Sequence, residues 1–238
     1  MEEQQADRRE QISQNLSRVR ERIEQACLQA GRPPSQVRLA VVTKNFPAAD
    51  VEILASLGCT DVAENRDQEA REKFTAVGSR SGLRWHMIGQ LQRNKARSVA
   101  RWADVVESVD RLELAQALSR AAEEEGRLLE VLIQVSLDPV PAEGRGGVAP
   151  QAAEALASAC LALPGLRLSG VMGVAPHPGD PSAAFDVLAE VRERLKRLDP
   201  GCQQMSAGMS DDLEQAIAAG ATQVRIGGAV LGNRAVLK

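Results

Sequence analysis

The spacing of hydrophobic positions changes along the chain. Ile12, Leu16, Val19 and Ile23 recur three or four residues apart, which predicts an amphipathic helix over 7–30. After a Gly- and Pro-rich break, short apolar runs alternate with longer stretches that mix polar and apolar residues. The apolar runs predict strands at 37–44, 61–65, 83–89, 105–110, 129–137, 166–174, 203–208 and 223–227. The mixed stretches predict helices at 48–57, 66–77, 91–102, 112–125, 150–163, 182–198 and 211–219.

The alternation of strands and helices predicts parallel strands, because a connection between parallel strands needs a crossover. Eight such strands in 238 residues favour closure into a barrel, since α/β barrels typically have about 250 residues. We therefore expect the α/β class and a single (β/α)8 TIM-type barrel domain over 1–238. An extra N-terminal helix and its lead-in would occupy 1–36. The alternative is an open doubly wound sheet, but no Gly-x-Gly-x-x-Gly follows the first strand.

Candidate chemistry lies where the expected strands end, because the C-terminal strand ends of such a barrel form its active face. Lys44 closes the first apolar run, and Gly227 and Gly228 close the last one. Ser206 and Gly208 lie at the end of the strand before it. These small residues would offer backbone N–H groups and a hydroxyl to a phosphate. A lysine at one strand end and a phosphate cradle at another suggest pyridoxal 5′-phosphate (PLP) held as a Schiff base.

Three of the polar residues near these strand ends also have simpler interpretations. Lys44 could extend to solvent, Arg225 could pair with a carboxylate, and His86 could be a buried structural histidine. If barrel walls surround Lys44, burial favours its neutral, nucleophilic amine. If Arg225 faces the ring nitrogen of PLP, the charged guanidinium keeps the pyridine unprotonated, so the ring is a poor electron sink. That arrangement suits carriage of the cofactor or limited proton transfer.

Composition excludes several other classes of function. The net charge of −3, the absence of tyrosine and the few other aromatic residues disfavour nucleic-acid binding. The first residues are acidic and polar, unlike a signal peptide, and no apolar run approaches the ~18 residues of a membrane span. We therefore expect a cytoplasmic protein with no membrane partner. The four cysteines lie far apart without CxxC spacing, so neither a disulfide framework nor a metal site is expected. The Pro- and Gly-rich stretch 138–149 is predicted to cover the barrel mouth.

Six short blocks carry a resemblance over nearly the whole chain. They are AVVTK at 40–44, EN at 64–65, WHMIGQLQRNK at 85–95, SVD at 108–110, GMSDD at 208–212 and VRIGGA at 224–229. Together they resemble the PLP homeostasis protein family, the YggS-like and PROSC-like proteins. These are fold type III barrels related to the N-terminal domain of alanine racemase.

The resemblance implies nine cofactor-binding residues and no catalytic residue. The Schiff base would form on Lys44, and Arg225 would face the pyridine nitrogen. The phosphate would be held by Ser206, Gly208, Gly227 and Gly228, and the ring would be lined by Asn65, His86 and Met172. The sequence departs from the family at Gly228, where members often have Ser or Thr, so a hydroxyl contact to the phosphate is lost.

The resemblance further implies a monomeric carrier or regulator of PLP and vitamin B6 pools rather than an enzyme. Its partners would be PLP and the apo forms of PLP-dependent enzymes that accept it. The alternative is a PLP-dependent amino-acid racemase of the alanine racemase type. Such racemases resemble two-base enzymes that use a tyrosine, and this sequence has none. A phosphosugar-binding barrel without PLP is a third interpretation, but it leaves Lys44 unexplained.

Overall fold

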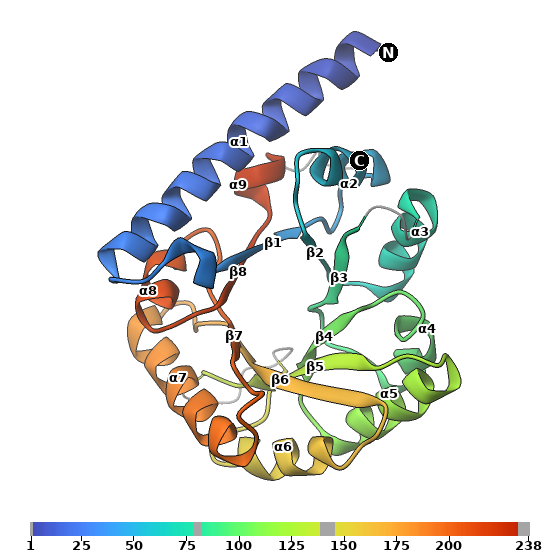
Figure 1. The fold of residues 1–238 in the computed structure, drawn as a ribbon, viewed down its shortest axis with the longest axis vertical. Helices are drawn as coiled ribbons and strands as arrows, with labels where there is room; N and C mark the ends of the chain where they lie inside the picture. Colours follow the sequence, from blue (N-terminus) through green and yellow to red (C-terminus); the bar gives the residue numbers. More distant parts are fainter. Residues whose placement is uncertain (1, 79–81, 139–145, 233–238) are drawn as a thin grey trace.

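A computed structural model describes residues 2–78, 82–138 and 146–232. In this part of the chain, eight parallel strands close into a barrel in the order β1 to β8, with the helices outside it (Figure 1). Pairing of Arg38 in β1 with Gln223 in β8 closes the ring, so the predicted (β/α)8 barrel is confirmed and the open sheet is excluded. The strands are β1 (Arg38–Val42), β2 (Asp61–Glu64), β3 (Arg84–Met87), β4 (Val105–Val109), β5 (Leu129–Val135), β6 (Leu166–Gly173), β7 (Gln204–Ser206) and β8 (Gln223–Ile226).

The helices follow the predicted order, with differences in extent and with additional short helical turns. The described elements are α1 (Glu2–Gln29), η1 (Pro34–Gln36), α2 (Ala48–Ser56), α3 (Asp67–Val77), η3 (Arg93–Lys95), α4 (Ala96–Val99), α5 (Leu112–Glu124), α6 (Ala153–Leu161), α7 (Pro181–Leu198), α8 (Leu213–Ala218) and α9 (Gly228–Leu231). Helix α1 begins five residues earlier than predicted. The helix expected over 91–102 is reduced to η3 and one turn of α4, because residues 92–95 are exposed and polar and bury no apolar side chain. Helix α9 is too short for its spacing to show in the sequence.

In the described residues no helix is both long and apolar enough to cross a membrane.

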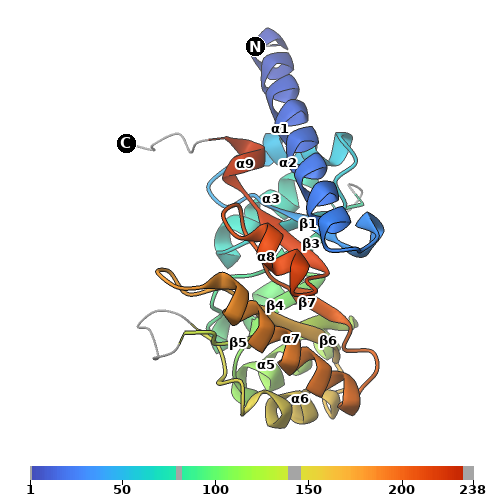
Figure 2. The same ribbon diagram turned by 90° about the vertical axis from the view of Figure 1, so that its left-hand side faces the viewer.

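Helix α1 lies along the outside of the barrel beside α8 and α9, and its first turns extend past the ring of helices (Figure 2). The apolar positions that predicted this helix are buried, including Ile12 and Leu16. Polar contacts fix it at both ends: Arg8 pairs with Asp50 at 2.6 Å, and Arg22 pairs with Glu214 at 2.5 Å. The helix therefore covers the seam where the chain closes the barrel.

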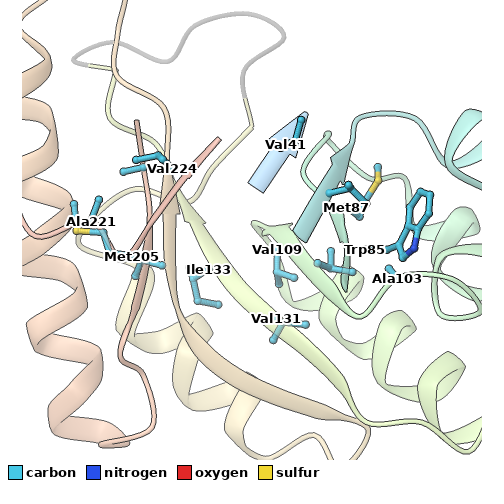
Figure 3. Packing of buried hydrophobic residues seen from close by; sticks show 14 of the residues in the cluster. Val41, Trp85, Met87, Ala103, Val109, Val131, Ile133, Met205, Ala221 and Val224 are labelled. Atoms are coloured by element: carbon cyan, nitrogen blue, oxygen red, sulfur yellow. The ribbon is translucent and has the colours of Figure 1, made fainter. Parts of the chain in front are cut away.

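The main apolar core lies between the strands and the surrounding helices. Figure 3 shows part of it, with Val41, Trp85, Ile133 and Val224 in one packed cluster. The opposite faces of the strands line the barrel interior, because successive strand residues point to opposite sides. The second apolar cluster of the described residues is small, formed by Ala40, Val42 and Ala63 with Ile88 packed against it. Barrel interiors of this class are usually filled by branched aliphatic residues, so the shortage of them here leaves room for polar groups.

The N-terminal ends of the strands are joined by a polar cluster around Glu130. The Glu130 carboxylate accepts hydrogen bonds from Arg84 at 3.1 Å and from Arg167 and Gln204. Arg38 in turn donates to the Gln204 side chain at 2.8 Å. These contacts occupy the end of the barrel opposite to the strand ends that carry the candidate site residues.

Candidate cofactor-binding site

The first and last strands end side by side. Their register aligns Ala40 with Arg225, so Lys44 and the glycines that follow β8 emerge at neighbouring positions on the same face. Gly227 lies so close to β1 that a Cβ atom there would be 3.1 Å from the Val42 carbonyl oxygen. A side chain here would make a tight contact, and the neighbouring strand would have to shift by a few tenths of an ångström to accept it. The structure thus brings Lys44, Gly227 and Gly228 together.

Lys44 is half-buried in a turn directly after β1. The Thr43 carbonyl oxygen accepts the Phe46 N–H at 3.0 Å, which closes the turn. Asn45 has a φ of 65°, and among the described residues it is the only non-glycine with a positive φ. Asparagine tolerates the left-handed region better than most residues, so the sequence itself suits this turn. Lys44 is therefore displayed by a defined turn rather than by an irregular loop.

A cavity of about 510 Å³ lies at the barrel mouth. This volume is within the range of small-ligand sites, roughly 300–1,000 Å³. Its wall includes Asn65, Ile88, Gly89, Gln134, Ser136 and Gly146. A Cβ atom on Gly89 would lie 2.0 Å from the Asn65 carbonyl oxygen, so only glycine lets β3 end against β2 here. Of the stretch predicted to cover the mouth, residues 139–145 lie outside the described part, while Val148 pairs with β5.

The Arg225 guanidinium is buried in the barrel interior. One nitrogen, Nη1, donates to Ser206 Oγ at 2.6 Å, and Nη2 donates to the Gly173 carbonyl at 2.8 Å. Burial lowers the pKa of Arg225, while the charges of Glu107 and Asp212 oppose that shift. Arginine keeps its proton in proteins, so a fixed positive charge lies among the ends of β6, β7 and β8.

A chain of buried polar groups continues below that guanidinium. Ser206 Oγ donates to Glu107 Oε2 at 2.6 Å, and Gln223 Nε2 donates to Glu107 Oε1 at 2.6 Å. His86 lies between two carboxylates, with Nδ1 2.7 Å from Glu107 and Nε2 2.9 Å from Asp61. Because both partners are carboxylates, each ring nitrogen acts as a donor, which describes an imidazolium ion.

Burial alone would lower the pKa of His86, but its bonds to Asp61 and Glu107 outweigh burial and raise the pKa to about 8. Burial would raise the pKa of Glu107, and the hydrogen bond and charge of His86 lower it to about 2. The same histidine lowers the pKa of Asp61 against the effect of burial. The interior thus alternates positive and negative groups from Arg225 down to Asp61.

The other residues predicted to bind the cofactor lie at different places in the barrel. Asn65 lines the cavity, and Met172 is buried on β6, where it pairs with Ser206 of β7. The Ser206 hydroxyl and both nitrogens of His86 already have protein partners in the interior chain, so their contact with a cofactor stays a prediction. Gly208 has a φ of 94°, and a Cβ atom there would be 2.8 Å from the Ala216 Cβ, so packing against α8 also requires glycine. No cluster of three or more residues with metal-ligand chemistry is found in the described ranges.

Sequence reasoning missed the partners inside the barrel, namely Asp61, Glu107 and Gln223. A signal for one of them was present: Glu107 interrupts the apolar run VVESV at 105–109. A carboxylate between valines in a strand must be buried with a partner, because an unpaired buried charge is very unfavourable. The identity of the partner depends on the barrel register and is not visible in the sequence.

The fold and the strand-end lysine define a barrel of the alanine racemase N-terminal domain class, and the model of that family matches residues 10–235. The chain belongs to the pyridoxal phosphate homeostasis protein family. A protein of that name from Mycobacterium tuberculosis (strain H37Rv) is 41% identical, with 96% of this chain and 95% of the relative covered. One from Escherichia coli (strain K12) is 37% identical, with 94% and 97% covered. The family resemblance of the six sequence blocks is therefore confirmed.

Solved structures agree with this assignment. PipY of Synechococcus elongatus with PLP bound has a TM-score of 0.78 and 32% identity, covering 93% of this chain and all of that one. The same protein without PLP has a TM-score of 0.83. An alanine racemase from Clostridium difficile has a TM-score of 0.74 at 15% identity and is covered over 56% of its length, so it shares the fold alone.

The imidazolium of His86 predicts a specific pH dependence of stability. Its pKa rises from the usual 6.5 to about 8 on folding, so its contribution is complete below pH 6.5 and is lost as the pH rises through 8. The loss corresponds to about 2 kcal/mol in the free energy of unfolding. Urea denaturation of the apo protein between pH 6 and 9 should show this loss in the wild type and not in His86→Gln. Parallel pH profiles for the two proteins would contradict a charged His86.

Proposed function

We propose that this protein binds PLP as a Schiff base on Lys44 and acts as a carrier and regulator in PLP and vitamin B6 homeostasis. The observation that carries the proposal is the placement of Lys44 beside Gly227 and Gly228 at the barrel mouth, with Arg225 buried next to them. The names of the relatives and the PLP-bound PipY structure support it.

The residues at the strand ends fit such a cofactor. The N–H groups of Gly228 and Ala229 begin α9, so no carbonyl of that helix can accept from them, and they suit a phosphate. A Cβ atom on Gly228 would meet nothing within 4 Å, which leaves space on this side of the chain. When bound, PLP supplies an aldehyde that reacts reversibly with an amine. Lys44 provides that amine from a half-buried turn.

Arg225 decides which chemistry this site favours. We assign its fixed charge to the pyridine nitrogen, where it would disfavour protonation of the ring. An unprotonated ring stabilises carbanions poorly. The sequence also lacks a tyrosine that could act as a second base on the opposite face. Both features favour carriage of PLP over amino-acid racemisation, which remains the alternative function.

We further propose that a monomer of this protein works in the cytoplasm and passes PLP to apo forms of PLP-dependent enzymes. All four cysteines are free, and Cys27, Cys160 and Cys202 are buried. Free thiols suit a reducing compartment. The cavity lined by Asn65, Gly89 and Ser136 lies at the same strand ends as Lys44, which suits the approach of an acceptor from this face.

Lys44→Ala should abolish the absorbance of the PLP Schiff base near ~420 nm and leave the fold intact, because the residue lies in a turn outside the packed core. Borohydride reduction and peptide mass mapping of the wild type should place the label on Lys44. Lys95→Ala is the matched control, since Lys95 is an exposed lysine of η3. Label on any other lysine would refute the assignment.

Gly228→Ser should tighten PLP binding about 3- to 10-fold, the effect of one added hydrogen bond of about 0.7–1.4 kcal/mol. Space for the new side chain exists at this position. Gly228→Ala adds the same Cβ without the hydroxyl and serves as the control. Dissociation constants of the three proteins would be measured by equilibrium dialysis. Equal affinities of the Ser and Ala variants would show that this position does not face the phosphate.

Loaded protein should reactivate an apo PLP enzyme and show no turnover of alanine. Reactivation is followed by the activity of the acceptor, and racemisation by chiral chromatography after long incubation at high protein concentration. The expected outcome follows from the single candidate lysine base and the Arg-paired ring. Racemisation that disappears in Lys44→Ala would replace the carrier function with an enzymatic one.

A further inference from the structure

A buried ionic cluster lies just outside the barrel behind Lys44. Its centre is Lys73 of α3, whose Nζ donates to the Thr43 carbonyl, to Glu64 and to Glu69, each at 2.7 Å. The Thr43 hydroxyl also donates to Glu64, at 2.6 Å. The residue that precedes Lys44 is therefore held through both its backbone carbonyl and its side chain.

The residue that follows Lys44 is held by the same cluster. Glu69 Oε1 accepts the backbone N–H of Asn45 at 2.5 Å, in addition to its bond with Lys73. Asn45 is the residue with the left-handed backbone, and this bond helps to keep it there. The turn that displays Lys44 is thus fixed on both sides by α3 and the end of β2.

Packing alone does not account for this cluster. The side chain of Lys73 is 7% exposed and that of Glu64 is fully buried. Burying an ion pair costs free energy that apolar residues of similar size would not incur. One carboxylate oxygen, Glu64 Oε2, also has no hydrogen-bond partner within the described ranges. Burial raises the pKa of Glu64 more than Lys73 and Thr43 lower it, which is a further sign of incomplete compensation. The bonds of the cluster to the turn after β1 all end on Thr43 and Asn45, the residues that flank Lys44.

We propose that Glu64, Glu69 and Lys73 are positioning residues that fix the turn carrying Lys44, so that its amine meets the cofactor aldehyde in one orientation. This inference rests on the proposed function. Loss of orientation slows a reaction between groups held in one site, and a displacement of about 1 Å costs on the order of 10²-fold. The cluster should therefore govern Schiff-base formation and leave non-covalent binding of the phosphate and ring unchanged.

The test uses Glu69, because its side chain is 24% exposed and its removal leaves the buried pair of Lys73 and Glu64 in place. Glu69→Ala removes the acceptor of the Asn45 N–H, and Glu69→Gln keeps an oxygen there. Glu72→Ala is the matched control: it removes an exposed carboxylate of the same helix that accepts only a 3.3 Å bond from Gln68 among the described contacts. Lys73→Met is a second variant that removes all three bonds of the ammonium group.

Two ligands are compared in order to distinguish the orientation of the Lys44 amine from non-covalent binding of the phosphate and ring. Full-length apo protein is mixed with PLP, and Schiff-base formation is followed by stopped-flow absorbance near ~420 nm. Affinity for pyridoxine 5′-phosphate, which has no aldehyde, is measured in parallel. Glu69→Ala should form the Schiff base about tenfold more slowly and bind pyridoxine 5′-phosphate within about twofold of wild type. Glu69→Gln should recover most of the rate, and Glu72→Ala should match the wild type.

Two results would overturn the inference. One is an unchanged rate in Glu69→Ala and in a folded Lys73→Met. The other is an equal fall in the rate of Schiff-base formation and in the affinity for pyridoxine 5′-phosphate. That result would mean that the cluster supports the barrel mouth in general. A different result would refute the proposed function. After borohydride reduction, the wild type would carry no PLP label, or the label would lie on a residue other than Lys44.

Discussion

Charge burial inside the barrel is the constraint on which the site depends. A guanidinium with almost no solvent contact is tolerable only if oxygen atoms surround it. Arg225 finds them in Ser206 and Gly173, and the carboxylate of Glu107 stands one position behind. That carboxylate in turn needs His86, and His86 needs Asp61. One buried cation therefore specifies polar residues on β2, β3, β4 and β7, and it explains why the interior is not filled with aliphatic side chains.

The same logic divides the molecule into two kinds of interior. The layer between strands and helices is apolar and supplies most of the stability by removing hydrocarbon from water. The inner faces of the strands carry the buried charged groups, and these polar side chains are fixed by hydrogen bonds and ion pairs. A substitution in the outer layer is expected to act on folding, whereas a substitution in the inner chain is expected to change both stability and the charge that a ligand meets.

The strands and most helices could be predicted from the sequence, because apolar runs and three-to-four-residue spacing report directly on burial. The helix predicted over 91–102 was too long, since only α4 and η3 form there, and α9 was not predicted, because one turn of helix has too few positions to show a period. Lys44, Arg225 and the glycines after β8 were visible because the fold class collects strand ends at one face. Glu69 and Lys73 look like an ordinary exposed pair four residues apart, and only the packing of α3 on β2 shows that they hold the turn at Lys44. Strand register and helix packing depend on contacts between distant residues, so the local pattern of apolar and polar positions does not predict them.

The pairing of β1 with β8 has a consequence for how the protein is made. Lys44 and Gly228 are separated by nearly the whole chain, and they become neighbours only when the last strand closes the ring. Synthesis proceeds from the N-terminus, so a nascent chain that has already folded its first strands still lacks β8 and the glycines that follow it. Residues up to Gly228 must therefore be synthesised before a small molecule can contact both strand ends. A ligand that needs both strand ends can therefore bind only after β1 and β8 have paired and the barrel has closed.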